Sequence, residues 1–427
     1  MIKMIKDTRL RRRLARMFCV TLSGVVMLGA FTSCGSGKQD KKVEAETSKE
    51  SAKDSDGFDP SSSEVKKKTE EIEKYIDELY YFDTDEEKQE ESYYEGLMEG
   101  LDDIYSTYYT KEQYEEMMED DSGEFEGIGA TVSKNQEDGT IYVVKPIPGS
   151  PAEKAGLLPG DVIVKVGDLE LTTDMELDYV VKHIRGEKGT SVDIEVYREE
   201  EPDFLTFTIT RDTITNPSVA HEMLDDKIGY IQVEQFNENT PKLFKDAVDD
   251  LQKQDAKAIV FDLRNNPGGY VTSVTEMLDY LIEDDLVADG NDTPGLLLET
   301  RDKNEDVLEQ YKCSDGHSVD LPMAVVVNGN SASAAEIFTG TLKDYDKATI
   351  VGTTTYGKGI VQSVIKLKDG SAIKLTIAQY FTPSGNTVHK VGIEPDVEVE
   401  LDEELKKKVT IEHEEDNQLQ EAIKQLD

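Results

Sequence analysis

The chain has 427 residues, more than one compact core accommodates, and this length predicts two or three domains. Acidic residues outnumber basic ones by 90 to 47, which gives a formal net charge of -43. Phosphate backbones would repel so acidic a chain, so nucleic-acid binding is excluded, and most of the charge is expected on a solvated surface.

A basic and then apolar N-terminus predicts that residues 1–34 are a secretory signal. Lysines and arginines crowd the stretch from Lys3 to Arg16, and an apolar run follows from Met17 to Phe31, shorter than the ~20 residues of a membrane-spanning helix. The run ends in a sequence that resembles a bacterial lipoprotein signal, in which Cys34 is lipidated and becomes the new N-terminus. The alternative is an uncleaved anchor. Both interpretations place the chain outside the cytoplasm, on the outer face of a bacterial cytoplasmic membrane.

Composition divides the next part of the chain into three segments. Residues 35–63 are polar and predict a disordered tether. Residues 64–121 carry apolar side chains at helical spacing, which predicts a small helical unit with its tyrosines and methionines in a core. Residues 122–212 combine strand-like runs with one helical stripe, Met175–Ile184, and form a candidate domain of their own.

Short apolar strands alternate with helices across residues 213–400, which predicts an α/β core with a largely parallel sheet. Within this core, Leu286–Leu321 is polar and predicts an irregular insertion, and residues 401–427 predict a charged helical tail. The expected strands are Gly229–Val233, Ala258–Leu263, Met323–Asn328 and Ala348–Val351, and the expected helices span about 241–253, 270–282 and 333–344.

The first motif with chemical meaning is Gly127-Ile128-Gly129-Ala130. Two glycines around one apolar residue allow successive backbone N–H groups to point into one cavity, and such a nest can hold a carboxylate. Ile128 would face a pocket for an apolar terminal side chain, and a peptide could add as a strand along Ala130–Val132. With the Ser150–Asp161 run at this spacing, the motif resembles a PDZ domain. The alternative is a tight turn that binds nothing.

Two further motifs follow apolar strands. The paired glycines Gly268 and Gly269 allow close backbone approach to a ligand and can supply an oxyanion-hole N–H. Asp262 and Arg264 before them suit a structural ion pair. Ser333 begins a helix, where unpaired N–H groups favour a developing oxyanion, although serine at that place is also an ordinary helix cap.

The fourth motif is a lysine in an otherwise apolar, glycine-flanked stretch. Lysine is seldom buried, and burial would lower the pKa of Lys358 so that its neutral amine can accept a proton from a serine. Gln362 lies four residues on, and even spacing in a strand would put it on the same face, within reach of the amine.

Two competing site classes fit less well. Gly352 to Lys358 matches the start of a phosphate-binding loop, but Gly359 stands where such a loop needs Ser or Thr, and a strand rather than a helix follows. The histidines do not lie beside a serine motif and show no metal-ligand spacing, so neither a His-based triad nor a metal site is expected.

Together the four motifs resemble the carboxyl-terminal processing peptidases, or tail-specific proteases, over about residues 64–427. The resemblance implies that Ser333 is the nucleophile, Lys358 the general base and Gln362 the residue that positions the lysine. It also implies an oxyanion hole made by the N–H of Ala334 and that of Gly268 or Gly269. The implied fold is a crotonase-like or ClpP-like α/β peptidase core with an inserted PDZ domain, a β-sandwich-like α+β unit, and helical terminal segments.

By this resemblance the expected function is that of a serine endopeptidase. It would recognise protein C-termini that are apolar through its PDZ domain, use no cofactor or metal, and form a homodimer through its terminal helices. The rival hypothesis from another class is a catalytically inactive PDZ adaptor at the cell surface.

Overall fold

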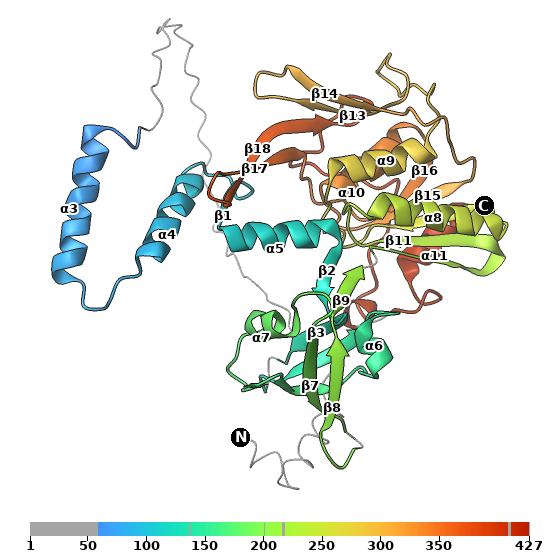
Figure 1. Ribbon diagram of the computed structural model, residues 1–427. Helices are drawn as coiled ribbons and strands as arrows, with labels where there is room; N and C mark the ends of the chain where they lie inside the picture. Colours follow the sequence, from blue (N-terminus) through green and yellow to red (C-terminus); the bar gives the residue numbers. More distant parts are fainter. Residues whose placement is uncertain (1–58, 136–137, 200, 216–217, 409–410, 427) are drawn as a thin grey trace, which may run out of the picture. The chain divides into compact units, whose positions relative to one another are not determined.

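The computed structural model describes residues 59–135, 138–199, 201–215, 218–408 and 411–426 (Figure 1). The predicted signal, the lipidation site Cys34 and the tether up to residue 58 lie outside these residues. The chain divides near residue 97 into a smaller N-terminal unit and a larger unit. Among the described helices, none combines the length and the apolar character needed to cross a bilayer.

The smaller unit contains helix α3 (Ser63–Leu79) and most of helix α4 (Glu86–Glu99). Ser62 caps α3, because its Oγ accepts the N–H of Val65 at 3.3 Å. The predicted apolar stripe is present, but Ile72, Tyr75 and Leu79 are each more than half exposed. The prediction that such residues form a core is therefore wrong for α3.

Residues 98–122 belong to the larger unit rather than to the helical unit predicted for 64–121. Strand β1 (Thr107–Tyr109) pairs antiparallel with β18 (Ala372–Phe381), with Thr107 opposite Lys374. Helix α5 (Lys111–Ser122) follows and starts at a capping box in which Thr110 and Gln113 exchange hydrogen bonds. Long-range strand pairing thus overrides the local helical pattern.

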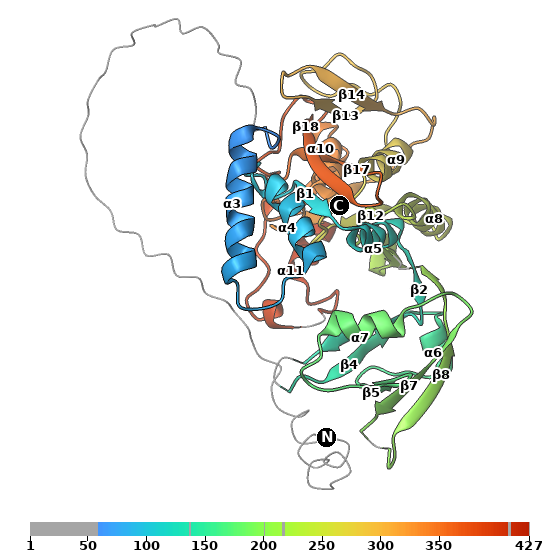
Figure 2. The same cartoon turned by 60° about the vertical axis from the view of Figure 1, so that its left-hand side comes forward.

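A second sheet, formed between residues 130 and 210, has the strand order β3-β4-β5-β7-β8 with β6 on β5, and a separate pair, β2 and β9, closes the segment. Val180 and Ile184 of α7 pack with Ile141 and Val143 in its core, and Figure 2 shows α7 beside β4. The helix predicted at Met175–Ile184 is confirmed, two residues shorter. The elements are β2 (Glu124–Gly127), β3 (Ala130–Lys134), β4 (Ile141–Pro146), α6 (Pro151–Ala155), β5 (Val162–Val166), β6 (Leu169–Glu170), α7 (Leu177–Ile184), β7 (Ser191–Tyr197), β8 (Leu205–Thr210) and β9 (Asp212–Thr215).

The largely parallel sheet predicted from the apolar strands is confirmed. Its order is β10-β11-β12-β15-β16-β19, and each neighbouring pair is parallel except β10 with β11. The elements of this region are β10 (Val219–Met223), the 3-10 turn η1 (Asp225–Lys227), β11 (Ile228–Val233), α8 (Thr240–Lys253), β12 (Ala258–Asp262), α9 (Val271–Leu281), β15 (Met323–Val327), α10 (Ala334–Asp344), β16 (Ala348–Gly352), β19 (Val397–Glu398), η2 (Leu405–Lys407) and α11 (Asn417–Lys424).

Alternating strand residues cover the two faces of this sheet. Ile259 and Phe261 of β12 pack into the large core beneath α8, α9 and α10. Val260 between them packs on the other face against Leu419 and Ala422 of α11. Helices therefore cover both sides of the sheet, as its all-apolar strands require (Figure 1). The carboxyl ends of β12, β15 and β16 remain side by side at one edge.

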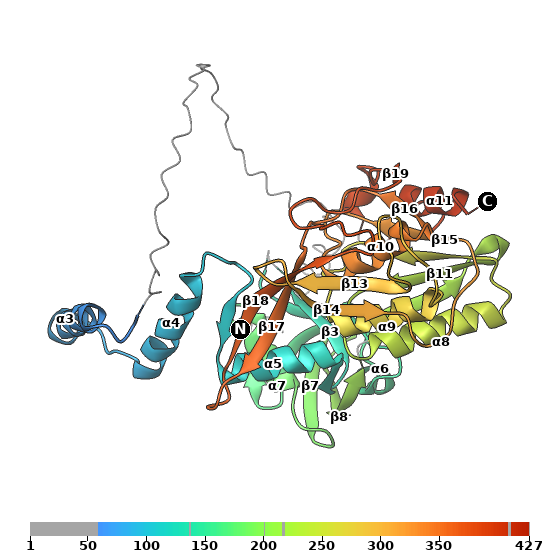
Figure 3. The same ribbon diagram turned by 90° about the horizontal axis from the view of Figure 1, so that it is seen from above.

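The expected irregular insertion at Leu286–Leu321 is wrong. Strands β13 (Leu296–Arg301) and β14 (Val307–Lys312) form an antiparallel pair there, and β13 also pairs with β18, which in turn pairs with β17 (Ile360–Lys366) (Figure 3). The sequence pattern of this strand pair is weak, because only β13 buries apolar residues such as Leu296 and Leu298, whereas most of β14 is exposed. The whole is a mixed α/β protein, as predicted.

Candidate active site

Ser333 lies in a strained turn between β15 and α10. Its backbone has φ 55° and ψ -116°, a conformation that costs a non-glycine residue on the order of 1–3 kcal/mol. Two contacts hold it there: its N–H donates to Glu336 Oε2 at 3.0 Å, and the buried Tyr380 hydroxyl donates to its carbonyl at 3.2 Å. Backbone strain of this kind is found mostly at functional sites, where a side chain is held in one fixed direction.

The loop after β12 meets the Ser333 turn. A Cβ placed on Gly268 would lie 2.6 Å from Ser333 Cβ and 2.9 Å from the nitrogen of Ala334. The Ala332 N–H donates to the Asn266 carbonyl at 2.9 Å and fixes the two loops together. Because β12 and β15 are parallel neighbours, their carboxyl ends share one edge. The structure thus brings together Gly268, Ser333 and Ala334, as the family resemblance implied.

The two glycines differ in the state of their N–H groups. Gly268 donates to Asn266 Oδ1 at 2.8 Å, whereas the Gly269 N–H makes no hydrogen bond within the described part of the chain. Ala334 is the first residue of α10, where a helix offers its N–H no partner. In this conformation the unengaged donors are therefore those of Ala334 and Gly269.

Lys358 lies in the loop between β16 and β17 and is half-buried. Burial lowers its pKa and the nearby Lys374 lowers it further, although Asp103 and Glu336 oppose them. Its Nζ lies 4.8 Å from the ring centroid of Tyr105. Among the described side chains, no hydrogen bond joins this amine to Ser333. The pKa shift has the direction that a lysine base needs.

Glu336 is the residue whose role sequence reasoning missed. Its side chain is fully buried and accepts four hydrogen bonds. Oε2 accepts the N–H groups of Ser333 and Lys358, at 3.0 and 2.8 Å. Oε1 accepts the Gly357 N–H at 2.7 Å and the Thr355 hydroxyl at 2.6 Å. One carboxylate therefore joins the serine turn to the lysine loop. The Ser-x-x-Glu spacing of Ser333 and Glu336 is by itself typical of an ordinary capping box and gives no sign of the lysine loop.

The even-spacing argument for Gln362 is wrong. Lys358 precedes β17, and a register shift lies between Val361 and Gln362, so the two side chains do not alternate along one regular strand. Gln362 lies opposite Thr376 of β18, and its Nε2 is buried with no hydrogen-bond partner in the described part. A buried amide without a hydrogen-bond partner lowers the stability of the fold by about 1–3 kcal/mol. The Gln362 amide is therefore a group to which a ligand or a side chain in another position would hydrogen-bond.

The segment Gly127–Ala130 leads into an edge strand. β3 ends the sheet order, so its outer backbone groups face no other strand. The Ile147 N–H donates to the Gly129 carbonyl at 2.9 Å, which by antiparallel alternation turns the N–H and C=O of Ala130 outward. That is the geometry for adding a peptide strand. Ile128 is only 2% exposed and packs in the core of this domain, so it does not face an open pocket.

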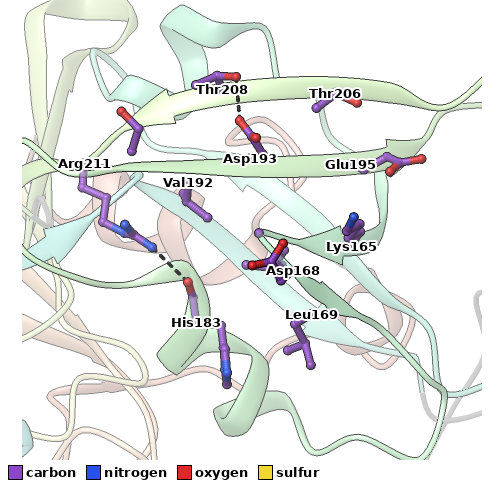
Figure 4. A pocket seen from close by; sticks show the side chains of 13 residues that line it. Lys165, Asp168, Leu169, His183, Val192, Asp193, Glu195, Thr206, Thr208 and Arg211 are labelled. Carbon is purple, nitrogen blue, oxygen red and sulfur yellow. Dashed lines mark hydrogen bonds between the residues drawn. The ribbon is translucent and has the colours of Figure 1, made fainter.

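A cavity of about 1040 Å³ lies elsewhere on the same domain, between β5, β7, β8 and the end of α7 (Figure 4). Ser191, His183 and Asp193 line it, but they are not a catalytic triad. His183 Nδ1 contacts the Tyr179 carbonyl of its own helix, and Asp193 accepts the Thr208 hydroxyl. None of the sequence-predicted site residues lines this cavity.

The structural interpretation of Asp262 and Arg264 is confirmed. The Arg264 guanidinium is nearly buried between Asp262, at 2.6 Å, and Asp416 at the start of α11, at 2.7 Å. Burial alone would lower its pKa, but the two carboxylates outweigh burial and raise it. Arg264 therefore ties the end of β12, just before the glycine loop, to the C-terminal tail.

Within the described ranges, three acidic side chains lie close enough together to share a cation. Carboxylate oxygens of Asp279, Asp284 and Asp315 lie within 4.8 Å of one another at the surface. Asp279 already accepts the N–H groups of Ser314 and Asp315. Exposed acidic groups of this kind are no sign of a metal, and they lie outside the serine and lysine loops.

Comparison with known proteins places this chain in a family. Residues 227–399 match peptidase family S41, and residues 142–198 match the PDZ domain. The carboxy-terminal processing protease CtpA of Bacillus subtilis (strain 168) is 40% identical over 322 residues, which are 75% of this chain and 66% of that protein. The "Probable CtpA-like serine protease" of Staphylococcus aureus (strain COL) is 38% identical over 338 residues, 78% of this chain and 64% of that protein.

This chain therefore spans just under two thirds of the length of these curated relatives. Among solved structures, the photosystem II D1 C-terminal processing protease is 28% identical, covers 78% of this chain and 86% of its own, and has a TM-score of 0.45. The strand-end loops that carry Gly268, Ser333 and Lys358 all lie inside the matched region. The chain belongs to peptidase family S41 and contains a PDZ domain.

Proposed function

We propose that this chain is a serine endopeptidase in which Ser333 is the nucleophile and Lys358 the general base. The observation that carries the proposal is the buried Glu336 carboxylate, which binds the backbone of both residues. A lysine with a lowered pKa and a serine on a strained turn are thereby held at one site. This combination suits nucleophilic catalysis better than binding alone.

The reaction follows from these positions. The neutral Lys358 amine accepts the Ser333 hydroxyl proton as Oγ attacks a peptide carbonyl. The N–H of Ala334 and that of Gly268 or Gly269 stabilise the oxyanion, and the unengaged state of Gly269 favours it as the donor. The lysine then gives its proton to the leaving amine, and water releases the acyl group from Ser333. Gln362, with its unpaired amide, would orient the lysine amine once the two meet.

The PDZ domain would choose the substrate. Its edge strand β3 and the outward Ala130 backbone support binding of an extended C-terminal peptide, with the carboxylate at Gly127–Gly129. The relatives named above are described as carboxy-terminal processing and CtpA-like proteases, which favours cleavage near substrate C-termini. The proposal extends to extracytoplasmic substrates with apolar C-termini, membrane attachment through Cys34 or an uncleaved anchor, a homodimer, and a crotonase-like or ClpP-like core.

The catalytic proposal is tested with the purified full-length chain and an unfolded reporter that ends in apolar residues. Ser333→Ala and Lys358→Ala should each lower kcat/KM by at least about 1000-fold, the scale seen when a catalytic nucleophile or base is lost. The exposed Ser191→Ala and Lys303→Ala serve as matched controls and should cleave normally. Equal cleavage by all variants would refute the dyad. No cleavage by any protein, with intact peptide binding, would favour the adaptor hypothesis.

The PDZ proposal is tested separately by binding a fluorescent apolar peptide to the full-length Ser333→Ala protein. The free carboxylate should bind at least about 10-fold more tightly than the same peptide amidated, because the amide cannot accept as many backbone hydrogen bonds. Ile128→Ala is a poor choice for this test, since Ile128 packs in the domain core and its truncation would also destabilise the fold. Equal affinities for the free and the amidated peptide would mean that the backbone of Gly127–Gly129 does not bind the carboxylate.

A further inference from the structure

The amine of Lys358 lies over the face of an aromatic ring from a distant part of the chain. Nζ is 4.8 Å from the ring centroid of Tyr105, which precedes β1, and the Tyr105 hydroxyl contacts that of Tyr356 at 3.4 Å. An ammonium group over a ring face is attracted by the ring quadrupole, whereas a neutral amine is not. The ring therefore selects the protonated form of the lysine.

Tyr105 is held in place by a hydrogen-bonded turn. Asp103 Oδ1 accepts the Tyr105 N–H at 3.1 Å, and its Oδ2 accepts the Ser106 hydroxyl at 2.6 Å. The buried Ser106 oxygen in turn accepts the N–H of Thr376, in β18, at 3.0 Å. The next residues form β1 and pair with β18. The ring is thus fixed to the sheet that also carries Gln362.

The surroundings of Lys358 act on its protonation in two opposite ways. Asp103 and Glu336 favour its ammonium form, while burial and Lys374 disfavour it. The neighbouring hydroxyl contact with Tyr356 raises the pKa of Tyr105 to about 12, so its ring is neutral at physiological pH and acts only through its face. The net effect lowers the pKa of Lys358, and the ring face of Tyr105 adds to the groups that favour the ammonium form.

We propose that Tyr105 is a positioning residue that holds the protonated Lys358 amine away from Ser333 until substrate is bound. This rests on the proposed function, since it assigns the resting contact of the same base. For the reaction to begin, the ammonium leaves the ring and gives its proton to water. The neutral amine can then accept the proton of Ser333 Oγ. The structure records the resting arrangement, in which the described amine contacts Tyr105 and makes no hydrogen bond with Ser333.

The test measures the protonation of Lys358 without relying on cleavage. In full-length Ser333→Ala protein, the pH dependence of acetic anhydride labelling at Lys358 is followed by mass spectrometry, with and without Tyr105→Leu or Tyr105→Phe. Leucine keeps the amine covered but removes the ring face, so the labelling midpoint should fall by about 0.4–1.5 pH units. Phenylalanine keeps the face and should leave the midpoint unchanged, as should Ile104→Leu in the same turn.

The variants Tyr105→Leu and Tyr105→Phe are also compared in protein that keeps Ser333, by measuring kcat/KM as a function of pH. In Tyr105→Leu the acidic limb of the kcat/KM profile should move to lower pH by the same amount as the labelling midpoint, because Lys358 loses its proton at lower pH. In Tyr105→Phe the limb should not move. An unchanged labelling midpoint in Tyr105→Leu, or an equal shift in Tyr105→Phe, overturns the proposal. A labelling shift without any Ser333-dependent cleavage supports the Tyr105 contact and refutes the proposed function instead. Tyr105→Met repeats the comparison should the leucine variant not fold.

Discussion

Replacing Glu336 by Gln removes the charge that joins the serine turn to the lysine loop while keeping the shape of the side chain. The carboxylate accepts four hydrogen bonds through two oxygens. A glutamine has one acceptor oxygen, and its NH2 would face donors. Turned one way, the amide leaves the N–H groups of Ser333 and Lys358 without an acceptor. Turned the other way, it leaves the Gly357 N–H without one, while the Thr355 hydroxyl can rotate and accept from the NH2.

The size of the effect follows from the burial of the group. A hydrogen bond to a charged partner contributes about 1.5–3 kcal/mol, and one or two of them are lost, so Glu336→Gln should reduce the free energy of unfolding by roughly 2–5 kcal/mol. The bond that holds the strained backbone of Ser333 is either lost or becomes a weaker bond to a neutral amide. The value of kcat/KM should therefore fall, by up to about 100-fold, the factor that a misplacement of 1 Å can cost.

Both quantities are measured on purified protein, by urea unfolding and by cleavage of the apolar-tailed reporter. Glu276→Gln is the matched control, since Glu276 is an exposed residue of α9 and should change neither. Unfolding within about 0.5 kcal/mol of the unmutated protein, together with normal cleavage, would refute the claim that this carboxylate joins the two loops.

Three other substitutions test neighbouring features. Gly268→Ala should abolish cleavage and lower the free energy of unfolding by more than about 2 kcal/mol, because its Cβ would lie 2.6 Å from Ser333 Cβ. The control is Gly149→Ala, where φ is also positive but the space is open, and it should cost only about 1 kcal/mol in the same urea unfolding. Ser333→Gly should lose cleavage yet gain about 1 kcal/mol of stability in urea unfolding, because glycine relieves the positive φ; a loss of stability would contradict the strain. Arg264→Met should destabilise by about 3–5 kcal/mol, because two buried carboxylates lose their cation, and an unchanged melt would show that the pair is dispensable.

The sequence predicted the parts of the fold that follow from local patterns. The strands at 228–233, 258–262, 323–327 and 348–352 and the helices between them agree with the expected bounds within one or two residues. Their all-apolar runs and helical stripes are strong signals because both sheet faces are covered. The serine and glycine motifs also meet as expected, since parallel strands place their carboxyl ends together.

What the sequence did not predict depends on pairing between distant residues. β14 is mostly exposed and lacks the alternation of a half-buried strand, so the β13–β14 pair was not recognised. The register shift before Gln362 arises from the pairing of β17 with β18 and leaves no local pattern. Glu336 was not predicted, because its partners Gly357 and Lys358 lie more than 20 residues away in the sequence.

The ion pair between Arg264 and Asp416 joins two residues that are synthesised far apart in time. The two residues are 152 positions apart, and Arg264 directly precedes the loop that carries Gly268. A chain that emerges from its N-terminus presents Ser333 and Lys358 before Asp416 exists to complete this anchor. Until α11 has docked on the sheet, the glycine loop lacks its support from the tail. The glycine loop therefore gains this support only after residue 416 has been synthesised, when Ser333 and Lys358 are already part of the chain.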